Sequence, residues 1–353
     1  MKGTIEIDGR LIGEGHPTYC IAELSANHNQ DFEEAKRLIR SAKESGADAV
    51  KIQTYTPDTI TIDCRSEHFL IGKDSIWHDR YLYDLYKDAY TPWEWQPKLK
   101  RYADEIGITL FSSPFDDTAV DFLEKMDVPA YKIASFEMVD IPLIKKVAST
   151  MKPIIMSTGM ATLEEIDEAV AAIRSTGNEQ LCLLKCLSAY PAPPEEMNLN
   201  GIGLLSRRYG CPIGVSDHTL GDLIPVASVA LGAAVLEKHF THSRSIPGPD
   251  SAFSSLPSEF KEMVDRVRLV QKALGTAFIG PSSAEKISRG HRRSLYVIKD
   301  LAAGEEFNKE NVRSIRPGNG LHPRYMDVVL GKTAKIPLKR GTPLTLDAIR
   351  EPI

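Results

Sequence analysis

The feature that most constrains the fold of this chain is a repeated unit, in which a short apolar run is followed by a stretch with helical periodicity. In residues 31–46, for example, apolar side chains recur on one face of a helix. Eight strands that alternate with helices predict a (β/α)8 TIM barrel, and a doubly wound open sheet is the alternative. The predicted strands lie within residues 18–27, 48–54, 108–115, 130–137, 153–160, 181–191, 211–219 and 233–241.

The end of the chain departs from this pattern. The order of apolar residues and glycine in residues 301–313 recurs in residues 338–350, as if a strand, a glycine turn and a short helix were used twice. We therefore divide the chain into a barrel domain over residues 1–275, a linker over residues 276–289 and a small domain over residues 290–353.

Composition limits the functions that are open to the chain. Its net charge is -5, but residues 291–353 are basic and residues 1–290 are acidic. The basic residues form no run, which argues against nucleic acid and favours docking onto the acidic body or contact with an anionic substrate. There is no apolar segment of about 18 residues, no signal peptide and no CxxC pair among the five cysteines. We expect a cytoplasmic protein with reduced thiols and no membrane partner.

One connection is longer than the barrel pattern requires. The insertion, residues 55–90, carries Trp77, Tyr81, Tyr83 and Tyr86, where a connection of a few residues would suffice. Loops at this end of a barrel build the site, so the insertion is predicted to be a lid or a specificity element. A surface excursion packed by its own aromatic side chains is the alternative.

Polar residues stand at the ends of most predicted strands. The carboxyl ends of barrel strands converge, and alternate residues of a strand share a face, so that Glu237 and His239 point together. The predicted barrel mouth is lined by Glu23, Asn27, His28, Lys51, Gln53, Ser113, Lys132, Ser135, Ser157, Lys185, Ser188, Asp217, His218 and His239. A solvated and inert mouth is the alternative.

Two kinds of chemistry follow from these residue types. Lys51, Lys132 and Lys185, together with the serines, predict a cradle for phosphate or carboxylate oxygens. Ion pairing of the lysines with Glu23, Glu137 or Asp217 is compatible with that role. His218 and His239 belong to consecutive strands and are predicted to reach one divalent ion. An acid–base pair of histidine and carboxylate is the competing interpretation.

The sequence also resembles a known family. AELSANHNQDFEEAKRLI, VKIQTY, SSPFD, YKIASFE, STGMATLEEI, CLSAYPAPPEEMNL, IGVSDHT, LEKHFT and PGPDSAFS are similar to successive motifs of the sialic acid synthase family. From HRRSLYVIKDLAAGE onward, the chain resembles the antifreeze-like (SAF) domain of that family, a β-clip fold. Within the family, YDLYKDAYTPWEWQPKLK and SAYPAP are most similar to the pseudaminic acid synthases.

The resemblance implies a transferase reaction. Phosphoenolpyruvate condenses with the open-chain aldehyde of an N-acylated amino sugar, here 2,4-diacetamido-2,4,6-trideoxy-L-altrose, to give a nine-carbon nonulosonic acid and phosphate. An N-acetylneuraminate or N,N'-diacetyllegionaminate synthase, with the same chemistry on another sugar, is the alternative. A metal-dependent aldolase and a non-enzymatic carbohydrate- or ice-binding protein are more remote.

The resemblance also implies roles for individual residues. A divalent ion, Mn²⁺ or Mg²⁺, is held by His218 and His239. Glu23 carries a proton, and a salt bridge to Lys51 is its structural alternative, which is compatible with that role. The implied catalytic residues are Glu23, Lys51, Gln53, His218 and His239. The implied substrate-binding residues are Ser113, Phe115, Lys132, Ser135, Ser157, Ser188, Tyr190, Ser216 and Asp250. In a domain-swapped homodimer, the small domain of one subunit covers the mouth of its partner and contributes Arg292 or Arg293.

Overall fold

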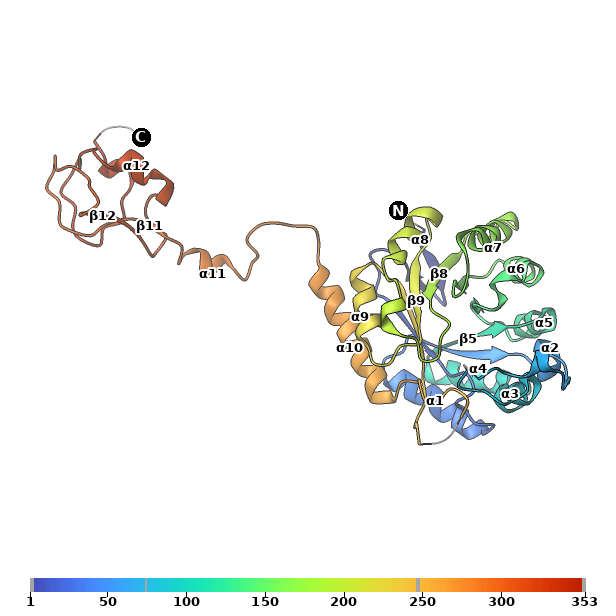
Figure 1. Ribbon diagram of the computed structural model, residues 1–353. Coiled ribbons are helices and arrows are strands. Elements are labelled where there is room, and N and C mark those ends of the chain that lie inside the picture. The colour runs from blue at the N-terminus through green and yellow to red at the C-terminus, as the bar shows by residue number, and fades with distance from the viewer. Residues whose placement is uncertain (1–2, 74, 246–247, 351–353) are drawn as a thin grey trace. The chain divides into compact units, whose positions relative to one another are not determined.

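The computed structural model describes residues 3–73, 75–245 and 248–350 (Figure 1). The chain forms two compact units, one that ends at Gly275 and one that begins at Thr276. In the motif PGPDSAFS, the first residue, Pro247, lies outside the described residues. None of the helices in the described ranges is long and apolar enough to cross a membrane.

The first unit is built on a closed barrel of parallel strands. Within the described residues the order around the barrel is β10-β3-β4-β5-β6-β7-β8-β9, so the last strand pairs with the first. This closure confirms the predicted (β/α)8 barrel and excludes the doubly wound sheet. The strands are β3 (Tyr19–Glu23), β4 (Ala49–Thr54), β5 (Thr109–Pro114), β6 (Tyr131–Ile133), β7 (Ile154–Ser157), β8 (Leu181–Cys186), β9 (Ile213–Asp217) and β10 (Val235–His239).

Helices surround the barrel (Figure 1). Local capping explains where several begin: the Asp31 side chain accepts hydrogen bonds from the first turn of α1, and Thr162 forms a capping box with Glu165 at the start of α7. The helices are α1 (Phe32–Glu44), α2 (Pro57–Ile60), α3 (Leu82–Ala89), α4 (Gln96–Ile106), α5 (Asp117–Lys125), α6 (Ile141–Ala148), α7 (Leu163–Ser175), α8 (Gly201–Tyr209), α9 (Leu223–Ala230) and α10 (Pro257–Leu274). Short 3₁₀ helices occupy Glu67–Phe69, Glu137–Val139 and Pro194–Glu196.

A hairpin that the sequence pattern did not predict precedes the barrel. Strands β1 (Ile5–Ile7) and β2 (Arg10–Ile12) pair antiparallel, and their isoleucines are buried in the main core. Arg10 forms an ion pair with Asp48, the residue before β4. The hairpin therefore lies at the amino-terminal ends of the barrel strands, opposite the predicted mouth.

The second unit has a small core of its own. Strands β11 (Ser294–Val297) and β12 (Val312–Ile315) pair antiparallel. Its helical segments are α11 (Lys286–Arg289), Pro323–Tyr325, α12 (Met326–Val329) and Leu346–Ala348. The core consists of Leu295, Val297, Leu301, Phe307, Val312, Val329, Ala334, Leu338, Leu344, Ala348 and Ile349.

The internal repeat seen in the sequence has a structural counterpart. The equivalent residues Leu301 and Leu338 pair with each other, because each backbone N–H donates to the carbonyl of the other at 2.8 and 2.9 Å. Gly304 and Gly341 also occupy equivalent turns and have φ angles of 87° and 88°. These angles lie in the left-handed region that favours glycine. The two copies thus pack against each other.

Candidate active site

Strand register brings polar side chains together inside the mouth of the barrel. Residues paired in register in parallel strands point to the same side, and His239 pairs with Glu23, which pairs with Lys51. Glu237 pairs in the same way with Ser216. The side chains that share this inner face are Glu23, Lys51, Gln53, Ser113, Lys132, Ser157, Cys186, Ser216, Glu237 and His239.

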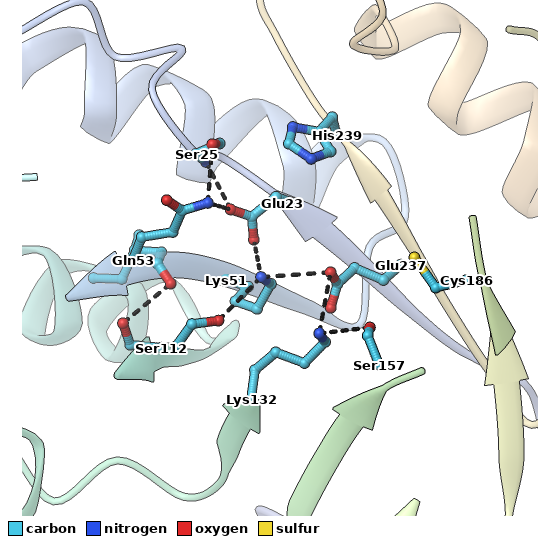
Figure 2. Close-up of polar contacts among 12 residues, drawn as sticks. Glu23, Ser25, Lys51, Gln53, Ser112, Lys132, Ser157, Cys186, Glu237 and His239 are labelled. Atoms are coloured by element: carbon cyan, nitrogen blue, oxygen red, sulfur yellow. Dashed lines mark hydrogen bonds and ion pairs between the residues drawn. The ribbon is translucent and has the colours of Figure 1, made fainter. Parts of the chain in front are cut away.

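Two lysines and two carboxylates form a buried ionic chain (Figure 2). Lys51 Nζ lies 2.7 Å from Glu23 Oε2 and 3.4 Å from Glu237 Oε1. Lys132 Nζ lies 4.0 Å from the same Glu237 oxygen. Both lysines also donate to hydroxyls, Lys51 to Ser113 and Lys132 to Ser157. The predicted ion pair of Glu23 with Lys51 is therefore present.

The environment gives the two carboxyl groups different properties. Burial raises the pKa of Glu23, although Lys51 opposes this effect. Although burial opposes the charge of Glu237, Lys132 and Lys51 hold its pKa below the ordinary value. Burial lowers the pKa of Lys132. Glu23 is consequently the stronger base of the two carboxylates.

A hydrogen-bond network holds Glu23 from its other side. Gln53 Nε2 donates to Glu23 Oε1 and to Ser25 Oγ, both at 3.0 Å, and the Ser25 backbone N–H donates to Glu23 Oε1 at 3.1 Å. The Ser25 hydroxyl donates to Asp250, whose pKa is raised by burial. The orientation of the Glu23 carboxylate is thus fixed by Lys51 and by this network.

The predicted histidine pair is present beside this network. The ring centroids of His218 and His239 are 5.4 Å apart, and His218 Nδ1 lies 2.9 Å from the Leu187 carbonyl oxygen. That contact leaves Nε2 of His218 available as a ligand. His239 Nδ1 is buried, has no hydrogen-bond partner among the described residues and lies 3.8 Å from Asp250 Oδ2. Burial and the neighbouring His218 hold the pKa of His239 well below its ordinary value.

These properties fit a divalent cation held by two protein ligands. A neutral imidazole with a buried nitrogen that lacks a partner is a suitable donor. Within residues 3–73, 75–245 and 248–350, no group of three or more His, Cys, Asp or Glu is arranged to hold a metal ion. His218 and His239 would therefore leave the remaining coordination positions to water or substrate oxygens.

An aromatic wall borders the histidines. The Tyr190 ring lies 4.3 Å from that of His218, 5.2 Å from Phe253 and 5.5 Å from Trp77, measured between centroids. Trp77 belongs to the insertion, and its Nε1 donates to the Pro249 carbonyl oxygen at 2.7 Å. The insertion therefore reaches the barrel mouth, as a lid or specificity element requires, and does not pack only against itself.

A second aromatic contact joins the insertion to β5. The predicted residue Phe115 follows this strand, and its ring lies 5.1 Å from Tyr55, which in turn contacts Tyr86 at 5.7 Å. Phe115 is half-buried, so part of its ring is open to a ligand.

The remaining predicted serines gather around the strand that ends at Ser157. Ser135 Oγ accepts a hydrogen bond from the Gly159 backbone N–H at 3.2 Å. A Cβ atom at Gly159 would approach Ser188 Oγ to 2.2 Å and Ser135 Oγ to 2.7 Å, so only glycine fits there. The absence of a side chain lets both hydroxyls approach this backbone, which suits an anion site of hydroxyl and amide donors.

Several residues predicted for the mouth lie elsewhere. Lys185 points to the outer face of β8, because the next residue, Cys186, pairs with Ser216 and takes the inner face. The Lys185 Nζ donates to the Cys186 carbonyl oxygen. The prediction that three lysines line the mouth is therefore wrong, and only Lys51 and Lys132 of the three face inward. Asp217 also points outward and binds Lys238. His28 bonds with Thr91 and packs on Trp95, and Asn27 donates to Phe240 and Ser254.

The arginines predicted to reach a partner belong to the second unit. The Arg293 side chain donates to the Ser314 carbonyl oxygen at 3.1 Å, and Arg292 is exposed. The choice between them stays a prediction.

Sequence reasoning missed two residues of the mouth. Glu237 was recognised as sharing a face with His239, and the same alternation would have added it to the set. Cys186 was interpreted as a core thiol, but its Sγ lies 4.0 Å from His218 Nδ1 and 3.8 Å from Ser188 Oγ. Although burial opposes the thiolate, His218 lowers the pKa of Cys186 to about 7.

Comparison with known proteins agrees with this geometry. Residues 38–278 match the NeuB family, and residues 292–350 match the SAF domain. The chain belongs to the NeuB family. This NeuB chain is 44% identical over 335 residues to the pseudaminic acid synthase of Helicobacter pylori, which covers 94% of the chain and 98% of the relative. It is 46% identical over 326 residues to that of Campylobacter jejuni serotype O:2, covering 92% and 95%. These matches confirm the family resemblance.

Other NeuB relatives are less similar. The N,N'-diacetyllegionaminic acid synthase of Legionella pneumophila is 36% identical over 342 residues, covering 96% of each chain. Among solved structures, the N-acetylneuraminic acid synthetase of Leptospira borgpetersenii in complex with citrate has a TM-score of 0.72 and 31% identity. That comparison covers 82% of this chain and 95% of the other.

Proposed function

We propose that the chain is a phosphoenolpyruvate-dependent transferase that makes pseudaminic acid from 2,4-diacetamido-2,4,6-trideoxy-L-altrose. The observation that carries this proposal is the buried group of Lys51, Lys132 and Glu23 beside His218 and His239, in a chain 44% identical to a pseudaminic acid synthase. In this proposal the two lysines bind the anionic enol ester, and the histidines lie on the side of the sugar aldehyde. N-acetylneuraminate or N,N'-diacetyllegionaminate synthesis is the second candidate, since a relative with 36% identity carries the latter name.

Lys132 and the nearby hydroxyls are assigned to phosphoenolpyruvate. The Lys132 ammonium already donates to Ser157 Oγ at 2.7 Å, while its carboxylate neighbour Glu237 stays 4.0 Å away. A phosphate or carboxylate group can therefore approach this cation and offset its burial. Ser135, Ser188 and the Gly159 backbone N–H add donors on the same side.

The carbon–carbon bond forms between C3 of the enol and C1 of the sugar aldehyde, whose oxygen gains negative charge. His218 and His239 are the residues that would hold a divalent ion. When bound, such an ion supplies Lewis-acid polarisation of that aldehyde. The Tyr190 ring packs beside both histidines on this side of the mouth.

Glu23 is assigned to the proton transfer. After the carbon–carbon bond forms, C2 of the former enol accepts a water molecule. Phosphate then leaves with its bridging oxygen and the proton of the C2 hydroxyl, while the former aldehyde oxygen takes up the proton that the water gave to the base. Glu23 takes the proton of that water, because burial strengthens it as a base and Lys51, Gln53 and Ser25 fix its direction.

The insertion is assigned to recognition of the sugar. Trp77 of the insertion packs on Tyr190, which together with Phe253 forms an aromatic wall against the histidines. Such a wall suits the methyl group of a 6-deoxy sugar, whereas a C6 hydroxyl would need polar partners.

We also propose that the enzyme is a homodimer in which Arg292 or Arg293 of one subunit completes the mouth of the other. Within the first unit, α9 carries no charged residue. Leu223 of α9 and Leu269 of neighbouring α10 are 75% and 66% exposed. Apolar side chains gathered on one surface favour contact with another protein chain.

Phosphate release tests the proposed reaction directly. Purified full-length protein is incubated with phosphoenolpyruvate and one of three sugars: the 6-deoxy diacetamido altrose, the legionaminic precursor or N-acetylmannosamine. We expect strong turnover with the first sugar, and no turnover after treatment with a chelator. Strong turnover with a different sugar would transfer the assignment to the second candidate. Pyruvate as the co-substrate, without phosphate release, would instead indicate an aldolase.

A further inference from the structure

The residues that precede the two histidines bind each other on the outer face of strands β9 and β10. Asp217 precedes His218, and Lys238 precedes His239. The Lys238 ammonium donates to the Asp217 carboxylate, and their side chains are only 4% and 1% exposed. Because alternate residues of a strand point to opposite faces, this ion pair points away from the mouth and touches no reacting group.

The ion pair also fixes the chain on both sides of His218. Lys238 Nζ donates to the Thr219 carbonyl oxygen at 2.6 Å. Asp217 Oδ1 accepts from the Thr219 backbone N–H at 3.1 Å and from its hydroxyl at 2.8 Å. The residue after His218 is thereby tied to the residue before it and to the residue before His239.

These bonds lie at the point where the pairing between β9 and β10 ends. Strand β9 ends at Asp217, and its pairing with Lys238 is the last of the register between β9 and β10. His218 lies one residue beyond that pairing, so the ladder between these strands does not set its position relative to His239. A buried ion pair adds little stability compared with apolar side chains of similar size. Its contribution here is therefore geometric.

We propose that Asp217 and Lys238 are positioning residues that set the separation of the His218 and His239 imidazoles for a shared divalent ion. The inference rests on the proposed function in that it requires the histidines to bind a metal. Groups that orient metal ligands from outside the coordination sphere typically change metal affinity by about 10- to 100-fold when they are removed.

The test measures Mn²⁺ binding to the full-length protein by calorimetry, without substrate. We expect Lys238→Met and Asp217→Asn each to raise the Kd for Mn²⁺ by about 10-fold or more. The Mn²⁺ affinity of the double variant should be no lower than that of the weaker single variant, because the two residues act as a unit. The kcat of Lys238→Met should recover partly at high Mn²⁺ concentration, while the KM for phosphoenolpyruvate stays within about twofold.

A matched control comes from the other end of the barrel. Asp48 is a partly buried carboxylate that binds Arg10 and Arg268, far in the chain from both histidines. We expect Asp48→Asn to lower the thermal stability and to leave the Kd for Mn²⁺ unchanged. An equal loss of Mn²⁺ affinity in Asp48→Asn, or an unchanged Kd in folded Lys238→Met, would overturn the proposal.

Two further variants complete the design. If Lys238→Met and Asp217→Asn do not fold, the double variant Asp217→Leu with Lys238→Met replaces the buried ion pair with apolar side chains of similar size, and an unchanged Kd for Mn²⁺ in that variant also overturns the proposal. His239→Ala separates the two hypotheses. If it binds Mn²⁺ as tightly as the unaltered chain, the metal assignment itself fails, whatever the positioning variants show.

Discussion

Lys51 Nζ lies 2.7 Å from Glu23 Oε2, and both side chains are almost completely removed from solvent. The contact opposes the rise in the pKa of Glu23 that burial causes. Burial raises the pKa of Glu23 in spite of this contact, so Glu23 is more basic than an exposed glutamate. These properties suit a residue that must take a proton from water, and they make Glu23 the first residue to test.

Glu23→Gln keeps the size and the hydrogen-bonding capacity of the side chain but removes the base. We expect kcat to fall by about 10²- to 10⁴-fold while the KM for phosphoenolpyruvate changes little. Phosphate release under saturating substrate measures the effect. Glu164→Gln, at the exposed start of α7, serves as the control and should retain full activity. A kcat for Glu23→Gln within fivefold of the original would remove Glu23 from the proton transfer.

His239→Ala tests the metal site. We expect a folded protein, because the ring is close to the mouth and is surrounded by Tyr190 and Phe253, which can still pack on each other. Phosphate release should be lost, and so should Mn²⁺ binding. Circular dichroism confirms the fold. Normal turnover by this variant in the presence of a chelator would refute a metal-assisted reaction.

Glu137 predicts a pH dependence of stability. Burial raises the pKa of this carboxyl from 4.5 to about 7, and its Oε2 atom has no hydrogen-bond partner in the described part of the chain. The folded state therefore binds the proton more tightly than the unfolded state. The resulting stabilisation is complete below pH 4.5 and is lost as the pH rises through 7, with a total on the order of 3 kcal/mol.

Glu137→Gln isolates this effect. The variant cannot ionise, so we expect its stability relative to the original chain to rise between pH 5 and pH 8, as measured by urea unfolding of the barrel. The exposed Glu164→Gln serves again as the control. A stability difference that is the same at both pH values would contradict the prediction.

Trp77→Ala tests the role of the insertion in choosing the sugar. Loss of the indole removes the outer part of the aromatic wall and its hydrogen bond to Pro249. We expect the preference for the 6-deoxy sugar over N-acetylmannosamine, expressed as a ratio of kcat/KM values, to fall by about 10-fold or more. Tyr83→Phe removes from the same insertion a hydroxyl that donates to Asp58, and this variant should keep the ratio. An unchanged ratio in Trp77→Ala would assign specificity elsewhere.

Leu223→Glu with Leu269→Glu tests the proposed subunit contact. Charges on this apolar face should convert the dimer to a monomer and lower turnover, because the partner's arginine is then lost. Light scattering after size-exclusion chromatography measures the mass. Leu204→Glu, on a different helix and 46% exposed, is the matched control. A dimer that survives the double substitution would place the interface on another surface.

The barrel could be predicted because each strand carries its own signal. The runs that contain β3 to β10 are apolar, short and separated by amphipathic stretches, and convergence of the strand ends follows from the fold. Convergence of the strand ends, together with the alternation of side chains within each strand, predicts that Glu23, Lys51 and His239 lie together. Lys185 was misplaced because no residue type near it shows which face of β8 is inner; the register with Ser216 decides that. Contacts between distant segments, such as Trp77 with Tyr190, leave no local pattern in the sequence.

The pairing of Leu301 with Leu338 has a consequence for shortened forms of the chain. Gly304 donates to Ala334, and the equivalent Gly341 donates to Val297, the position equivalent to Ala334, so each copy pairs with the segment that precedes the other. Neither copy is a separate folding module, and removal of residues 330–350 would leave the first copy with exposed apolar side chains and unpaired backbone groups. The two copies are therefore expected to fold only together.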